Sequence, residues 1–166
     1  YRKYSKIISG PSQAAAILKY MIEQYDQRTE LVMMFLKTDS PKSMVKEIGY
    51  DLIKATRSIA NYGDKSLFRW FWPIGVIGFC DHEGYPHHTG LPLRQVFQLA
   101  EIEMPAVVPF IFDQTFAIKY ETLVSVRKCV YEALLASQES FGASWEPCIA
   151  RLWLSLYRAL NTKSLI

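Results

Sequence analysis

The last part of the chain carries the pattern that most restricts the fold. After Ser144, large apolar residues recur every three or four positions, as they do along one face of an α-helix: Ile149, Leu152, Trp153, Leu156 and Leu160. Ser144 is a suitable N-cap residue, and Pro147 is tolerated in a first helical turn. We therefore predict a helix here, and we assign its apolar stripe to core packing and not to a binding site.

The same spacing predicts other helices. They cover residues 12–25, 41–62, 93–101 and 115–137, and a shorter helix over residues 64–72 ends at Pro73. The run Leu31–Leu36 is wholly apolar, so its periodicity does not separate an extension of the first helix from a buried strand. Residues 105–112 have prolines at positions 105 and 109 and are predicted to be extended.

Residues 73–92 have the composition of a loop. They hold three of the eight prolines, four of the eight glycines and all three histidines. We expect a loop with room for one short hairpin around Ile77–His82. The fold class predicted from the whole pattern is all-α: a mostly helical single domain over residues 1–166. Because the chain does not begin with Met, we expect it to be a piece of a longer protein.

Composition narrows the classes of function. Half of the 166 residues are hydrophobic and 21% are charged, which is typical of a globular domain, and the aromatic share of 14% favours a protein-binding module. Residues 1–83 hold 12 Lys and Arg against 9 Asp and Glu, and residues 84–166 hold 7 of each. Without a concentrated basic stripe, we do not expect nucleic-acid binding.

Compartment and membrane contact can also be judged from the sequence. The three cysteines, Cys80, Cys129 and Cys148, are an odd number without the spacing of a disulfide framework, which favours reduced thiols inside a cell. The longest apolar stretch, Trp70–Cys80, is too short to span a membrane and contains a proline and two glycines. We therefore expect no membrane partner.

The segment Cys80–His88 gathers every histidine and one thiol, so a zinc site has to be weighed. Zinc sites usually combine two closely spaced ligand pairs separated by a longer loop, whereas these candidates crowd into one segment. We expect no metal and no cofactor, and a polar loop that faces water or a partner. A Cys80–His82 pair would need a third orienting group to act as a nucleophile, and no such motif is present. We therefore predict that the chain is not an enzyme.

The segment Leu67–Trp72 supplies four aromatic residues in five positions. On a short helix they would point in all directions, so at least one of them, Trp70 or Trp72, should reach the surface. Aromatic residues are frequent anchors of protein interfaces, although wedging between helices explains them equally well. With the polar loop that follows, the predicted partner-binding residues are Trp70, Trp72, Tyr85, His87 and His88.

Two segments resemble a known family. Trp72-Pro73-Ile74-Gly75, with Leu67 and Arg69 before it and Phe79 after it, is similar to the Trp-Pro-x-Gly segment of the nonstructural NSs proteins of phlebovirus-like viruses (phenuiviruses). Glu121–Val130 resembles the start of a helix in that family, and Pro147–Leu160 falls where the family has an apolar helix. The likeness covers residues 64–162. It departs from the family at Ile77, where a second proline is usual.

This resemblance implies an all-helical core made by a negative-strand RNA virus. It implies a protein without catalytic residues that captures host signalling or transcription proteins, in the host cytoplasm or nucleus, and so antagonises the interferon response. Some members of the family self-assemble, so self-association is a further expectation. The alternative hypothesis is a viral nucleocapsid or matrix-type module that binds RNA or itself. It requires a basic groove built from Lys42, Lys46, Lys54, Arg57 and Arg69. A third hypothesis, a small metal-dependent enzyme, would centre on Cys80 and His82.

Overall fold

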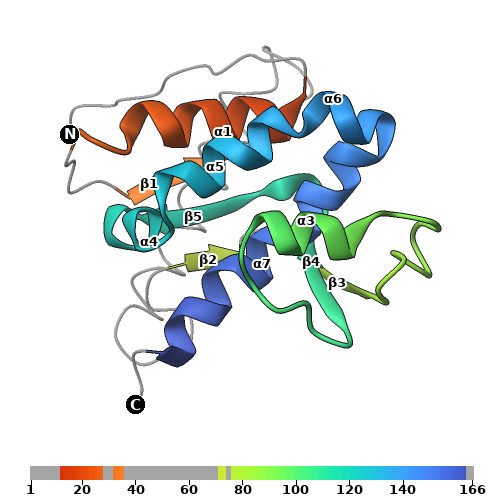
Figure 1. The fold of residues 1–166 in the computed structure, drawn as a ribbon. Helices are drawn as coiled ribbons and strands as arrows, with labels where there is room; N and C mark the ends of the chain where they lie inside the picture. The colour runs from red at the N-terminus through yellow and green to blue at the C-terminus, as the bar shows by residue number, and fades with distance from the viewer. Residues whose placement is uncertain (1–11, 28–31, 36–70, 74–75, 164–166) are drawn as a thin grey trace, which may run out of the picture.

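The computed structural model describes residues 12–27, 32–35, 71–73 and 76–163 (Figure 1). Its elements are α1 (Gln13–Gln24), β1 (Val32–Phe35), β2 (Phe71–Pro73), β3 (Ile77–Cys80), α3 (Leu93–Leu99), β4 (Val108–Ile111), η1 (Phe112–Gln114), β5 (Phe116–Lys119), α4 (Tyr120–Ser125), α5 (Lys128–Ala136), α6 (Gln138–Phe141), η2 (Gly142–Ser144) and α7 (Trp145–Lys163). The all-α prediction is wrong, because these strands form two antiparallel sheets among the helices.

The three-stranded sheet has the order β1-β5-β2, with β5 in the centre. Phe116, Ala117 and Ile118 of β5 are fully buried, as expected for a central strand that is covered on both faces. Aromatic rings join the strands on one face: the ring centre of Phe116 lies 5.1 Å from that of Phe35 and 5.2 Å from that of Phe71. β1 and β2 belong to distant parts of the chain, and β5 is what brings them into one sheet.

Two predicted helices are therefore replaced in part by strands. The predicted helix over residues 115–137 was wrong at its start, because its first residues are β5, and the rest is divided into α4 and α5 by the extended residues Val126 and Arg127. The predicted helix over residues 64–72 is wrong at Phe71 and Trp72, which belong to β2. Residues 64–70 and the helix predicted over residues 41–62 lie outside the described part of the chain. The apolar run at residues 31–36 contains β1, in agreement with the strand alternative.

Helix α7 is the centre of the core, as its apolar stripe predicted. Every side chain from Arg151 to Tyr157 is buried, so this part of the helix is enclosed on all sides. Trp153 and Tyr157 contact the aromatic face of the three-stranded sheet, with ring centres 5.4 Å from Phe116 and 5.0 Å from Phe71 respectively. Trp145 opens the helix and donates its indole N–H to the carbonyl oxygen of Leu134, at 3.0 Å. This bond fixes the start of α7 against α5.

Helix α1 begins as predicted, with Ser12 as N-cap accepting a hydrogen bond from the backbone N–H of Ala15. A second acceptor comes from α7: the Glu146 carboxylate accepts hydrogen bonds from the Ala14 N–H (3.0 Å) and from Nε2 of Gln114 (2.6 Å). Gln114 extends this hydrogen-bond network to Trp153, because its Oε1 accepts a hydrogen bond from the Trp153 indole N–H at 2.9 Å. The start of α1 is thus tied to α7 through polar groups within the core.

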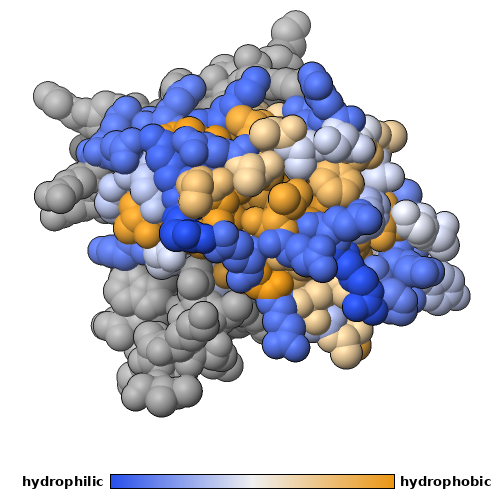
Figure 2. All heavy atoms as spheres, in the orientation of Figure 1, coloured by the Kyte–Doolittle hydropathy of each residue, from blue (hydrophilic) through white to orange (hydrophobic). Residues whose placement is uncertain are grey.

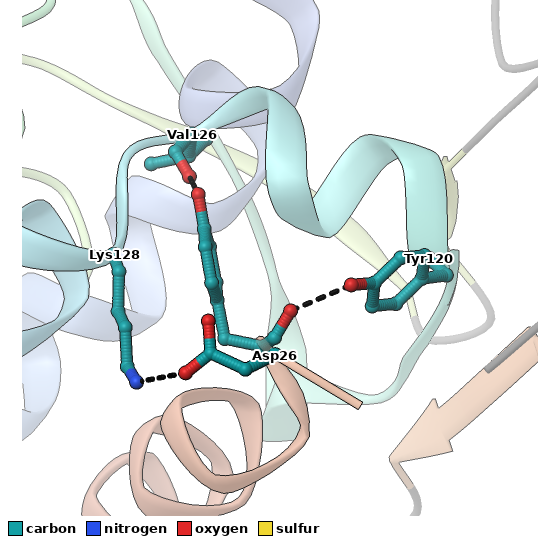
Figure 3. A network of polar contacts seen from close by, with 5 residues as sticks. Asp26, Tyr120, Val126 and Lys128 are labelled. Atoms are coloured by element: carbon teal, nitrogen blue, oxygen red, sulfur yellow. Dashed lines mark hydrogen bonds and ion pairs between the residues drawn. The ribbon is translucent and has the colours of Figure 1, made fainter. Parts of the chain in front are cut away.

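The end of α1 is tied to α4 and α5, and α1 and α5 run side by side (Figure 1). Figure 3 shows the contacts: the Tyr25 hydroxyl donates to the Val126 carbonyl oxygen (2.8 Å), and the Tyr120 hydroxyl donates to the Tyr25 carbonyl oxygen (2.6 Å). Lys128 forms an ion pair with Asp26 at 2.5 Å. These bonds hold the kink at Val126 in place, which explains why α4 and α5 do not form one continuous helix.

Candidate functional site

The two-stranded sheet places apolar side chains at the surface. β3 pairs antiparallel with β4, with Ile77 opposite Ile111 and Phe79 opposite Pro109. Along β3 exposure alternates: Ile77 and Phe79 are exposed, and Gly78 and Cys80 are buried. Phe79 is 58% exposed, which is unusual for so large an apolar residue. The predicted hairpin around Ile77–His82 is wrong in its partner, because β3 pairs with β4 and not with a strand of the same loop. The extended structure predicted for residues 105–112 is confirmed over β4, Val108–Ile111, whereas Phe112 begins the 3-10 helix η1.

An aromatic cluster covers the opposite face of this sheet. The ring centres of Phe110 and Phe112 are 4.8 Å apart, and the His87 imidazole meets both rings edge to face, at 5.3 Å from each. Gly78 is required below them, since a Cβ atom there would lie 2.7 Å from the Phe112 ring and 2.8 Å from the Phe110 ring. Phe110 is buried, whereas Phe112 and His87 are exposed. The cluster thus anchors two exposed rings on a rigid support.

The loop after β3 is ordered by Asp81. Its Oδ1 accepts the backbone N–H of Glu83 at 2.9 Å and that of Tyr85 at 3.0 Å. These backbone donors, chiefly Glu83, hold the pKa of the Asp81 carboxyl below its usual range, so it is ionised at neutral pH. The Leu91 N–H bonds the Glu83 carbonyl oxygen and closes the loop. Tyr85, which is 62% exposed, is held outward by this framework.

We call Tyr85, His87 and Phe112 the aromatic surface. His87 contacts Phe112 directly, and Tyr85 precedes His87 in the same hydrogen-bonded loop. Other apolar residues are exposed nearby along the chain. Val76 precedes β3, and Val107, which is 58% exposed, precedes β4 in the loop after α3. In the region of that loop, Figure 2 shows apolar residues at the lower edge of the coloured surface. Elsewhere on that face hydrophilic and apolar residues are interspersed.

Behind the cluster lies Arg151 of α7. Its guanidinium is 4.6 Å from the centre of the Phe110 ring, and Nη1 donates to the Pro147 carbonyl oxygen at 2.9 Å. Its Nε is buried and has no hydrogen-bond partner among the described residues. A cation against the face of an aromatic ring is favourable, and more so when water is excluded. Arg151 therefore supports the Phe110 ring from the core side.

The two buried thiols lie near the same arginine. Burial raises the pKa of Cys80, against the opposing effect of Arg151, and raises the pKa of Cys148 to about 12. Both are therefore protonated at neutral pH, and a thiol in that state is a poor nucleophile. His82 is exposed, whereas Cys80 is buried against the Val108 carbonyl oxygen. This geometry gives no support to a Cys80–His82 catalytic pair.

The predicted partner-binding residues differ in outcome. Tyr85, His87 and His88 are all exposed on the loop after β3. Trp72 is paired through its backbone with Ala117, but its side chain and the whole of Trp70 lie outside the described part of the chain. Sequence reasoning missed Phe79 and Phe112. The alternation of large and small residues in Ile77-Gly78-Phe79-Cys80 was the available signal for a half-exposed strand.

Within the described ranges, no group of three or more His, Cys, Asp or Glu side chains is arranged to hold a metal ion. Among the same residues no helix is long and apolar enough to cross a membrane. The five basic residues of the RNA-binding alternative fall between residues 36 and 70, outside the described part. Comparison with protein-family models, curated proteins and solved structures found no match to this chain.

Proposed function

We propose that this chain is a protein-binding module without catalytic activity, and that it acts as a viral nonstructural protein that captures a host signalling or transcription protein and antagonises the interferon response. The observation that carries the binding role is the aromatic surface, in which exposed rings are held by a packed cluster beneath them. Interfaces favour aromatic anchors of this kind, because rigid rings lose little entropy on binding. The viral role rests on the resemblance to the NSs family.

Rigid support is what separates this surface from scattered exposed apolar residues. The Asp81 carboxylate fixes the loop that carries Tyr85, and the Phe110 ring fixes His87 and Phe112. A partner therefore meets side chains whose positions are already set, which lowers the cost of ordering an interface. Singly exposed apolar residues need no such explanation.

The test uses a cell reporter for interferon induction, together with affinity capture of host proteins. Wild-type chain should suppress the reporter, and Tyr85→Ala with Phe112→Ala should relieve suppression and lose the same captured host proteins. Val107→Ala is the control, because Val107 is 58% exposed, against 62% for Tyr85 and 39% for Phe112, and lies outside the aromatic surface. Thermal unfolding of each purified variant checks folding. Wild-type chain that leaves the reporter unchanged would contradict the immune role, and variants that keep every partner would contradict the surface.

A further inference from the structure

The outer edge of β3 has no strand partner within the described part of the chain. The Phe112 N–H donates to the Val76 carbonyl oxygen at 2.9 Å, which fixes the alternation of the antiparallel pair. In this register Gly78 and Cys80 direct their backbone groups toward β4, whereas Ile77 and Phe79 direct theirs away from it. No hydrogen bond to these outward groups comes from the described residues. As far as the described ranges show, two residues of β3 therefore have N–H and C=O groups that can pair with another strand.

The neighbouring edge positions are less accessible than those of β3. On β4 the outward position opposite Ile77 is Ile111, which is fully buried. On β4 the outward position opposite Phe79 is Pro109, which has no N–H to offer and is a usual protection of an edge strand. At the end of β3, the Asp81 N–H bonds the Tyr85 carbonyl oxygen at 2.9 Å, so the loop itself uses that position. β3 lacks two of the usual protections of an edge strand, because residues 76–80 include no charge and no proline. Among the described residues of this sheet, Ile77 and Phe79 are therefore the positions whose outward backbone groups are exposed and have no partner.

We propose that β3 pairs with β3 of a second copy of this chain, antiparallel, about a twofold axis at Gly78. In that register Ile77 lies opposite Phe79 of the second copy, and the reverse pair follows by symmetry. Each pair exchanges its outward N–H and C=O groups, so the free groups of both edges are satisfied. The two sheets join into one sheet with the order β4-β3-β3-β4.

The side chains fit this occupant. The exposed Ile77 and Phe79 lie on one face, where cross-strand pairing places them against the same residues of the second copy and removes them from water. On the other face the axis passes Gly78, which has no side chain. A twofold axis sets like charges near each other, and this strand has none to repel. The pairing is argued independently of host-protein capture, because it uses the outer edge of β3 and the side chains that it covers, Ile77 and Phe79, lie on the face opposite the aromatic surface.

The first experiment measures the molar mass of the purified chain by sedimentation over a range of concentrations. We expect a monomer–dimer equilibrium whose dissociation constant rises about tenfold or more in Phe79→Lys, because the change places charge in an apolar cross-strand pair. Val107→Lys is the matched control, with the same charge at a residue of equal exposure away from the β3 edge. A chain that stays monomeric at every concentration overturns the proposal, and so does an equal loss in both variants.

The second experiment tests the register and does not depend on how Phe79→Lys folds. Ile77→Cys and Phe79→Cys are made separately in a Cys129→Ser background, since Cys129 is the exposed native thiol. An equal mixture of the two variants should form disulfide-linked dimers under mild oxidation several-fold faster than either variant alone, because residue 77 faces residue 79 of the second copy. Equal rates in the mixture and in the separate samples would overturn this pairing. Neither experiment involves a host protein, so failure here leaves the proposed host-binding role standing.

Discussion

The polar network between α1 and α7 allows a quantitative test through Glu146→Ala. The change removes the acceptor of two donors, the Ala14 N–H and Nε2 of Gln114, and Gln114 is only 4% exposed. Leaving a buried donor unsatisfied costs about 1–3 kcal/mol, and a carboxylate at a helix N-terminus contributes about 0.3–1 kcal/mol. Because Glu146 is only half-buried, water can replace part of the loss. We expect the free energy of unfolding to fall by about 2–4 kcal/mol.

The assay is urea unfolding followed by tryptophan fluorescence, since Trp145 and Trp153 are both fully enclosed and report loss of the core. Glu146→Gln keeps one acceptor oxygen without the charge, so it should lose clearly less than Glu146→Ala. Glu139→Ala is the control at an exposed position of α6 and should change stability by no more than about 0.5 kcal/mol. A loss below about 1 kcal/mol in Glu146→Ala would refute the assignment of this network to stability.

Two further predictions concern a loop glycine and alkaline pH. Gly84 and Gly90 both have positive φ angles, of 91° and 69°, but a Cβ atom at Gly84 would lie 2.8 Å from Leu91 and one at Gly90 meets nothing within 4 Å. Gly84→Ala should therefore lower the thermal midpoint more than Gly90→Ala, and equal shifts would show that the clash is relieved. Burial raises the pKa of Cys148 from 9.0 to about 12, so its contribution to stability is complete below about pH 9 and is lost as pH rises through about 12. The urea midpoint of the wild-type chain should therefore fall over this pH range. From pH 9 to 10 it should fall less steeply in Cys148→Ala. Above pH 10 Tyr131 and Tyr157 contribute as well, because burial also raises their pKa values. An unchanged slope in that variant would show that the thiol is not the group that titrates.

The sequence was most informative where the structure is local. Helix α7 was predicted because its stripe repeats within one helix, and Ser12 identified the start of α1 in the same way. β5 was missed because Phe116–Lys119 contains a short apolar run that reads equally well as the start of a helix. What makes it a strand is pairing with β1 and β2, and neither partner is near it in the sequence. Tertiary pairing thus overrode the local pattern.

The candidate site follows the same rule. The loop composition correctly indicated that His87 and His88 are exposed, and Tyr85 of the same loop is exposed as well. Phe112 was not predicted, because its exposure depends on the antiparallel register that sets it over Gly78. Phe79 was noted only in the family resemblance. Its neighbours in the sequence do not indicate that its side chain is exposed, because that exposure depends on how β3 pairs. Exposure of large residues on short strands is decided by which strand pairs with which.

The central position of β5 also affects how the protein is made. A ribosome completes β1 and β2 long before it reaches residue 116, so both strands must wait for the strand that bonds them. Helix α1 is in the same situation, since Glu146 and Lys128 are synthesised later still. A nascent chain that stops before β5 lacks the strand that pairs with both β1 and β2. We therefore expect the amino-terminal half made alone to be recovered only when the carboxyl-terminal half is supplied with it.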